Sequence, residues 1–437
     1  MFLKSIHLKN VKCFDELSLS FEEEAQAGTI RQWTLLLGEN GTGKSTLLKA
    51  IALVTSGSEA LSDLLTEPSD WIQYGEKECV ISAVLLTKEM EEKKITLSIQ
   101  QEHSRLDAII HNKESLQWLD EALKQSPEDY FLVGFGAYRH LSSNDSFVGK
   151  RSAFLNVRAQ SVATLFDPDA TLNPLESWAM SLDYQHDTGL DIVRDVLDDF
   201  LPGISFSQID KQRGRLLFKT EDGIVPLRSL GDGYQSVAAW IGDLLYRVMQ
   251  TFDNHPSPLE ARGLLLIDEV DLHFHPKWQQ ELFSFLSSRL PNFQLIITTH
   301  SPMIAQQVGP GELHYIRREN GRINLEQFTG NPRSLLLNQM LMSEAFGVES
   351  DESWQLQEKK ARYRKLRDQE QLSAQEKEEL DQLATELSER PRPEGTQADQ
   401  ICDFRKKKWT SYDKSNKNCR SENRETSNQD SLASYNT

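Results

Sequence analysis

The chain has 437 residues, of which 38% are hydrophobic and 26% charged, and its formal net charge is −18. This length is enough for one large or two medium domains, each with a hydrophobic core. An acidic surface repels nucleic acid, so DNA or RNA binding would need a local basic patch, and a generally solubilising surface is the simpler interpretation. No stretch reaches about 18 apolar residues, which argues against a membrane-spanning helix.

The cysteine pattern and the first residues indicate a reducing compartment. Cys13, Cys79, Cys402 and Cys419 form no C-x-x-C pair, so the sequence suggests neither a zinc site nor a disulfide framework. Residues 1–14 alternate like a strand and lack the long apolar core of a signal peptide. We therefore expect a cytoplasmic protein.

The first 100 residues predict the N-terminal lobe of an α/β domain. Strand patterns occur at residues 1–14, 33–37, 80–86 and 95–99. The run at 33–37 is wholly apolar, as in a buried parallel strand, and a glycine-rich loop and a helix over 44–54 follow it. Residues 101–225 are mixed, with helical patterns near 114–125 and 189–201. We expect these residues to form an inserted arm that projects from the core.

The α/β pattern returns in residues 226–330 and gives way to helices. The expected elements are helices at 236–252 and 276–290 and strands at 263–267, 294–298 and 313–317. Residues 331–390 predict a helical extension, in which two helices over 353–389 meet at 372–374 beside a capping box, Ser373 with Glu376. Residues 391–437 are polar, and we expect them to be disordered.

The clearest motif is the segment Gly38-Glu-Asn-Gly-Thr-Gly-Lys-Ser-Thr46, which fits the Walker A pattern in full. It lies between a buried strand and a helix, as this motif requires. Its glycines allow backbone N–H groups to face a phosphate, and the helix N-terminus adds positive potential. Lys44 would contact the β- and γ-phosphates of ATP, and Ser45 would provide an oxygen ligand to Mg²⁺. The residues assigned to nucleotide binding here are Gly38, Asn40, Gly41, Gly43, Lys44, Ser45 and Thr46.

Two further motifs fall at the ends of predicted parallel strands, where ligands bind in such sheets. The apolar run 264–267 ends in Asp268 and Glu269, which fits Walker B. Asp268 would hold Mg²⁺, and Glu269 would polarise the attacking water. His300 follows the next strand and could donate a hydrogen bond to the γ-phosphate.

Two other features have ordinary interpretations. Asp167-Pro-Asp169 could be a metal pair but is more typical of a turn. The basic run Arg405-Lys-Lys-Lys-Trp409 could contact nucleic acid or a partner, although a solvated tail is the simpler interpretation.

Taken together, Walker A, Walker B with Asp268-Glu-Val-Asp-Leu-His-Phe-His-Pro276, and Thr298-Thr-His-Ser-Pro302 resemble the ABC-type ATPases of the SMC/RecF/OLD group. The opening residues 2–14 are similar to the first strands of that group, and the resemblance covers about 1–60 and 225–330. It implies an α/β fold, a P-loop ABC/SMC-like ATPase head. It also implies that Asp271 is the D-loop residue and that His300 is the switch histidine.

The resemblance further implies a signature loop that contacts ATP bound to a second copy of the chain. The candidate is Ser229-Leu-Gly-Asp-Gly-Tyr-Gln235, in which Leu230, Gly231, Asp232 and Gly233 are the binding residues. Gly231 stands where the usual motif has serine, so the hydroxyl contact is missing unless Ser229 replaces it, and hydrolysis is expected to be slow. Gln73 and the segment 134–140 are alternative positions for the Q-loop.

The tail segments 330–334, 344–347 and 372–380 look like those of stand-alone ATPases of antiphage systems, the PtuA-like ATPases of Septu and its retron-associated relatives. That resemblance implies an ATPase that acts as a homodimer or higher oligomer and controls a separately encoded nuclease, of HNH type in Septu. A RecF-like ATPase of DNA repair is the main alternative. A transporter subunit fits less well, because of the SMC-like opening residues and the D-loop sequence.

Overall fold

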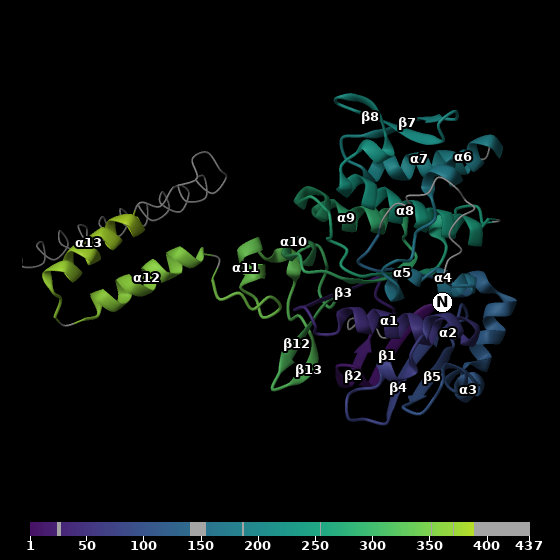
Figure 1. Ribbon diagram of the computed structural model, residues 1–437, viewed down its shortest axis with the longest axis horizontal. Coiled ribbons are helices and arrows are strands. Elements are labelled where there is room, and N and C mark those ends of the chain that lie inside the picture. Colours follow the sequence, from purple (N-terminus) through teal and green to yellow (C-terminus); the bar gives the residue numbers. More distant parts are fainter. Residues whose placement is uncertain are drawn as a thin grey trace, which may run out of the picture. The chain divides into compact units, whose positions relative to one another are not determined.

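The computed structural model describes residues 1–23, 28–139, 154–185, 188–253, 255–350, 352–369 and 371–388 (Figure 1). The chain divides into two compact units, Met1–Asp351 and Glu352–Thr437. All three described sheets belong to the first unit. The expected disordered tail at 391–437 and the basic run at 405–409 lie outside the described residues.

A six-stranded sheet forms the centre of the first unit. In spatial order its strands are β13 (Arg322–Gln327), β12 (Leu313–Glu319), β3 (Trp33–Gly38), β11 (Phe293–Thr298), β10 (Gly263–Ile267) and β6 (Leu132–Phe135). Five of these strands are parallel, and β13 pairs antiparallel with β12 at the edge. Strands β3, β10 and β11 contain apolar runs because helices cover both faces of the sheet, so their sequences predict a central place in it.

Alternate residues of the central strands pack into two different hydrophobic cores, one on each face of the sheet. Leu264 and Leu266 pack with α1 (Lys44–Thr55) and an antiparallel sheet, whereas Leu265 and Ile267 pack with helices on the other face. Helix α1 contacts strands of both sheets and therefore lies between them (Figure 1). This helix starts at the P-loop, so the buried position of α1 fixes the loop to the central sheet.

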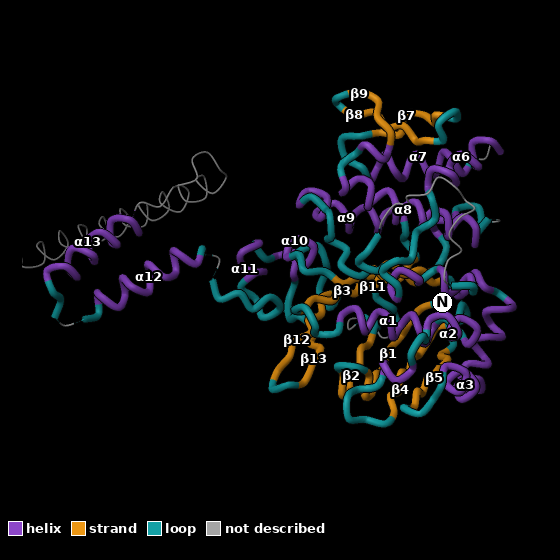
Figure 2. Tube along the Cα trace, viewed as in Figure 1, coloured by secondary structure: helices purple, strands orange, loops and turns teal. Residues whose placement is uncertain are grey.

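The antiparallel sheet is built from the N-terminal strand patterns and is shown as a separate set of strands in Figure 2. Its spatial order is β2 (Phe14–Ser20), β1 (Phe2–Val11), β4 (Glu78–Leu86) and β5 (Glu92–Gln100). The helices beside it are α2 (Ser58–Leu64) and α3 (Arg105–Gln125). The helix expected at 114–125 begins earlier because Ser104 and Asp107 form a capping box.

The other face of the central sheet carries several helices and a small sheet. The helices on this face are α6 (Leu175–Gln185), α7 (Gly189–Phe200), α8 (Asp232–Thr251) and α9 (Pro276–Arg289). The short helices α4 (Val157–Gln160) and α5 (Ala163–Phe166) pack instead in the core that contains α1. The small antiparallel sheet consists of β7 (Ser205–Asp210), β8 (Arg215–Thr220) and β9 (Gly223–Pro226). We expected 101–225 to form a projecting insertion, yet β6 within that interval is an edge strand of the central sheet.

The C-terminal part begins within the first unit and continues in the second. Helices α10 (Pro302–Ala305) and α11 (Leu337–Leu341) belong to the first unit. The second unit contains α12 (Trp354–Arg367) and α13 (Ala374–Ser388), joined by ion pairs that include Arg362 with Glu379 at 2.7 Å. Of the apolar stripe predicted on the first of these helices, Leu366 is buried whereas Trp354 is 78% exposed. Among the described helices, none combines the length and apolar composition needed to cross a bilayer.

Candidate functional site

The P-loop, residues 38–46, connects β3 to α1 as the sequence predicts. Gly41 and Gly43 adopt φ angles of 78° and 98°, which other residues rarely adopt. A Cβ atom at Gly43 would lie 2.5 Å from the Phe14 ring and 2.6 Å from the Cys13 sulfur. Glycine is therefore required there for both conformation and space, and the loop is held against the start of β2.

Lys44 lies at the first position of α1, with only 6% of its surface exposed. Its Nζ donates hydrogen bonds to the carbonyl oxygens of Gly38 at 2.7 Å and Glu39 at 3.1 Å. Burial lowers the pKa of Lys44, while the carboxylates of Asp268 and Glu269 oppose that shift. This opposition indicates that Walker A and Walker B residues lie within electrostatic range of each other. Ser45 and Thr46 are half-buried in the first turn of α1.

Asp268 follows β10 directly and is almost completely buried. The Thr298 hydroxyl donates to its Oδ1 at 2.6 Å, and the backbone N–H of Glu269 donates to the same hydroxyl at 2.7 Å. Glu269 has a φ of 46°, an unusual conformation for a residue other than glycine. Such strained residues are common at functional sites.

Asp271 links this loop to the end of β11. Its Oδ1 accepts hydrogen bonds from the Thr299 hydroxyl at 2.5 Å and from the backbone N–H of His300 at 3.3 Å. The His300 residue is exposed. The structure therefore brings together the residues expected from Walker A, Walker B, the D-loop and the switch position, at the carboxyl ends of β3, β10 and β11.

Arg139 belongs to the second Q-loop candidate, 134–140, but the sequence assigned it no role of its own. It lies after β6, is 2% exposed, and donates hydrogen bonds to the carbonyl oxygens of Asp268 at 3.0 Å and Glu269 at 2.8 Å. Its own carbonyl accepts a hydrogen bond from Ser236 of α8. Burial lowers the pKa of Arg139 to about 10, so its guanidinium remains charged at neutral pH. Arg139 thus connects Walker B to the helix that begins at the signature loop.

The candidate signature loop lies at the N-terminus of α8. Gly231 is the N-cap residue, and Gly231 and Asp232 are exposed. A Cβ atom at Gly233 would lie 2.7 Å from the carbonyl oxygen of His273, so glycine permits a close approach to the loop after Walker B. Leu230 is buried. Within the described part of the chain, no hydrogen bond joins residues 230–233 to the P-loop of the same chain.

The two Q-loop candidates lie in different parts of the first unit. Gln73 hydrogen-bonds the Asp15 carboxylate beside the antiparallel sheet, whereas the segment 134–139 borders Asp268. His140, the last residue of that second Q-loop candidate, lies outside the described residues. Asp167 accepts a hydrogen bond from the backbone N–H of Asp169 at 2.9 Å, which confirms the turn interpretation.

The oxygen atoms at this site fit a magnesium ion. The Ser45 hydroxyl is at the start of α1, and the Asp268 carboxylate has one oxygen held by Thr298. Hydroxyl, carboxylate and phosphate oxygens together with water are the ligands that Mg²⁺ prefers.

Two family models match the chain. One, described as an AAA ATPase domain, matches residues 1–134, and the other, described as an AAA domain, putative AbiEii toxin, Type IV TA system, matches residues 98–305. Septu protein PtuA of Bacillus mycoides (strain KBAB4) is 26% identical over 389 residues, which are 89% of this chain and 50% of that protein. The chain is a P-loop ATPase.

The ATPase also has relatives among retron proteins. The Retron Ec83 probable ATPase of Escherichia coli is 34% identical over 119 residues, 27% of this chain and 22% of that protein. The Retron Vc95 probable ATPase of Vibrio cholerae serotype O1 biovar El Tor is 34% identical over 108 residues, 25% of this chain and 21% of that protein. The ATPase therefore spans half or less of the length of these relatives.

Among solved structures, the ATPase is similar to an SMC head domain from Thermotoga maritima. The TM-score is 0.44 at 16% identity, and the match covers 76% of this chain and 100% of that one.

Proposed function

We propose that this ATPase binds ATP with Mg²⁺ at the P-loop and hydrolyses it between two copies of the chain. The observation that supports this is the gathering of Lys44, Asp268, Glu269, Asp271 and His300 at the carboxyl ends of adjacent parallel strands. Ligands in such sheets bind at this edge.

Each residue has a role that its position supports. Backbone N–H groups of the P-loop and the Lys44 ammonium bind the phosphates, so the lysine exchanges its loop carbonyls for phosphate oxygens. Ser45 and Asp268 would hold Mg²⁺, which neutralises charge on the phosphates when bound. Glu269 orients the attacking water and accepts its proton, and His300 donates a hydrogen bond to the γ-phosphate.

The signature loop explains why two copies are needed. Gly231 and Asp232 are exposed at the N-terminus of α8, where backbone N–H groups favour an anion. We propose that this end of α8 contacts the γ-phosphate held by the P-loop of a second copy, with Asp271 near the same interface. Because Gly231 provides no hydroxyl group, hydrolysis is slow.

We further propose that the protein acts in antiphage defence in the cytoplasm, where it controls a separately encoded effector nuclease. The names of the relatives, Septu protein PtuA and two retron ATPases, support this role. We also propose that residues 331–410, beyond the last nucleotide motif, bind the partner protein. Nuclease chemistry is assigned to the effector, and the ATPase alone is expected to leave DNA uncut.

A phage challenge combined with co-purification tests this function. Cells that express the chain with the nuclease gene encoded beside it are expected to resist phage, and the nuclease should co-purify with the chain. Lys44→Ala should abolish ATP binding and resistance, whereas Lys94→Ala, which removes an exposed lysine from β5, should change neither. Undiminished ATP binding in Lys44→Ala would contradict the assignment of the P-loop as the ATP-binding site. Loss of DNA repair without any effect on phage would instead favour a RecF-like role.

A further inference from the structure

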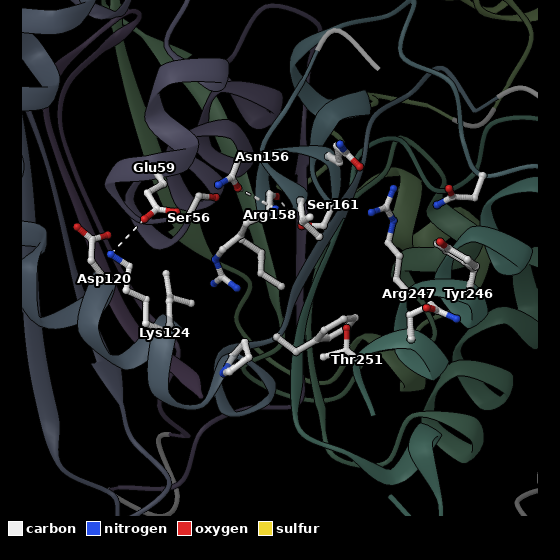
Figure 3. A pocket seen from close by; sticks show the side chains of 18 residues that line it. Ser56, Glu59, Asp120, Lys124, Asn156, Arg158, Ser161, Tyr246, Arg247 and Thr251 are labelled. Carbon is white, nitrogen blue, oxygen red and sulfur yellow. Dashed lines mark hydrogen bonds and ion pairs between the residues drawn. The ribbon is translucent and has the colours of Figure 1, made fainter. Parts of the chain in front are cut away.

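A cavity in the first unit lies away from the nucleotide motifs. Its volume is about 480 Å³, and its walls come from the ends of α1 and α3, from α4, and from the last turns of α8 (Figure 3). Ser56, the residue after α1, and Thr251, the last residue of α8, both line it. A volume of this size lies in the range of small-molecule sites in proteins.

The cavity and the nucleotide site lie at opposite ends of the same two helices. Helix α1 begins at Lys44 and has 12 residues, and α8 begins at Asp232 after the signature loop and has 20 residues. At 1.5 Å per residue these helices are about 18 and 30 Å long. The cavity is therefore a separate site, between the core that contains α1 and the core that contains α8.

Most charged groups in the cavity walls already have a partner of opposite charge or a hydrogen-bond donor. Lys124 pairs with Glu59 at 3.2 Å, and Arg247 pairs with Asp243 at 2.6 Å. The Asp120 carboxylate accepts hydrogen bonds from the backbone N–H and the hydroxyl of Ser58, at 2.8 and 2.6 Å. The positive charges of Lys124 and Arg247 are therefore offset by carboxylates, whereas Asp120, which accepts only from neutral donors, keeps its negative charge.

Arg158 differs from these groups. Its Nη2 donates to the carbonyl oxygen of Thr55 at 2.9 Å, and its buried Nε has no hydrogen-bond partner among the described residues. Burial lowers the pKa of Arg158 to about 10, and no carboxylate opposes that shift. Binding the carbonyl at the end of α1 therefore uses only part of the guanidinium of this half-buried residue, and a partly desolvated charge without a counter-ion is costly.

We propose that this cavity binds a phosphorylated small molecule of about mononucleotide size, with Arg158 as the phosphate ligand. A guanidinium presents a planar fork of donors that matches phosphate oxygens. Side-chain amides and hydroxyls in the walls, among them Asn156, Asn173 and Ser161, provide further hydrogen-bonding groups. In Figure 3 Arg158 and Arg247 come from opposite walls of the opening.

Such a ligand would contact both lobes at once. It would bridge the C-terminal end of α1, which starts at the P-loop, and the C-terminal end of α8, which starts at the signature loop. Because each helix is rigid, a ligand here would favour one relative orientation of the two nucleotide motifs. The binding proposal itself does not depend on the function proposed above.

The test uses the full chain with Lys44→Ala, so that the P-loop site is impaired. Binding of AMP, inorganic phosphate and uncharged adenosine is measured by isothermal titration calorimetry. AMP is expected to bind saturably and adenosine at least about ten-fold more weakly, because hydrogen bonds to a charged group are strong. Tighter binding of AMP than of phosphate would identify a nucleotide, and the reverse order would identify a free phosphate site.

Two added substitutions assign the binding to this cavity. Arg158→Gln should weaken binding about ten-fold or more, because the glutamine side chain carries no charge. Its amide still provides a donor for the Thr55 carbonyl, so the end of α1 keeps a partner. Arg105→Gln is the matched control, since Arg105 also donates to backbone carbonyls but lies outside the cavity, and it should have no effect. If Arg158→Gln does not fold, Gln250→Trp, an exposed wall position on α8, should block binding by filling the space. Absence of binding by AMP and phosphate, or binding that neither cavity substitution weakens, would overturn the proposal.

Discussion

Thr298 holds the two acidic residues of Walker B in place through a single hydroxyl. It donates to Asp268 and accepts from the backbone of Glu269, and its side chain is completely buried. We expect Thr298→Val to lower ATP hydrolysis about ten-fold or more, because the carboxylate loses a fixed orientation, while ATP binding without Mg²⁺ is retained.

Thr34→Val is the matched control for this change. Thr34 is equally buried on β3 of the same sheet, and its hydroxyl has no partner among the described residues. This substitution should leave the hydrolysis rate and the melting temperature almost unchanged. Equal rates in the two variants would show that the Thr298 hydroxyl has no role in the site.

His314 of β12 predicts a pH dependence of stability. Burial lowers its pKa from 6.5 to about 3, so below pH 6.5 the unfolded chain binds a proton that the folded chain excludes. From this residue alone, the free energy of unfolding should fall by about 2 kcal/mol between pH 7 and pH 5. Chemical denaturation of the wild type and His314→Leu should show this loss only in the wild type. Parallel pH profiles would contradict it.

Among single residues, the sequence predicted those of the nucleotide motifs but not the residues that hold them in place. Lys44, Asp268 and Glu269 could be assigned because each belongs to a short pattern with its own strand or helix beside it. Arg139 and Thr298 act through contacts that join β6 and β11 to Walker B, and their roles depend on strands that are distant in the sequence.

Two glycines flank Asp232, the first residue of α8, and they lie in different surroundings. No atom lies within 4 Å of a Cβ at Gly231, whereas a Cβ at Gly233 would meet the His273 carbonyl at 2.7 Å. We expect Gly231→Ser to be tolerated and to increase hydrolysis, because serine is a good N-cap and adds the missing hydroxyl. Gly233→Ala should displace the loop and abolish ATP-dependent association.

Turnover assays on Gly231→Ser test the effect of the added hydroxyl on hydrolysis, and light scattering on Gly233→Ala tests the role of the loop in association. If Gly233→Ala associates normally with ATP, the signature assignment of this loop is wrong.

The elements that the sequence predicted best are those with one decisive pattern. The apolar runs of β3, β10 and β11 could only be buried parallel strands beside nucleotide motifs. β6 was missed because it has four residues and lies in a mixed interval, and its place at the sheet edge is set by pairing with β10. The start of α3 was placed late because it is marked by the capping box of Ser104 and Asp107, while the apolar residues Leu106 and Ile110 that follow are exposed.

The second unit should be separable from the nucleotide site. All nucleotide motifs lie within Met1–Asp351, and the ion pairs that join α12 and α13 are on the surface, where such pairs stabilise weakly. Truncation after residue 350 should therefore preserve ATP binding and the melting temperature of the first unit, but abolish association with the effector nuclease. Calorimetry and co-purification check these outcomes. A truncated chain that still retains the nuclease would place the interface in the first unit.

For the whole molecule, we propose that ATP brings two copies together through the signature loop. Light scattering of Glu269→Gln, which should bind ATP without hydrolysing it, tests this most directly. We expect the measured mass to double when ATP and Mg²⁺ are added, and to remain that of one chain when Lys44→Ala or Gly233→Ala is also present. A Glu269→Gln chain that binds ATP yet keeps the mass of one chain at every concentration would contradict the account.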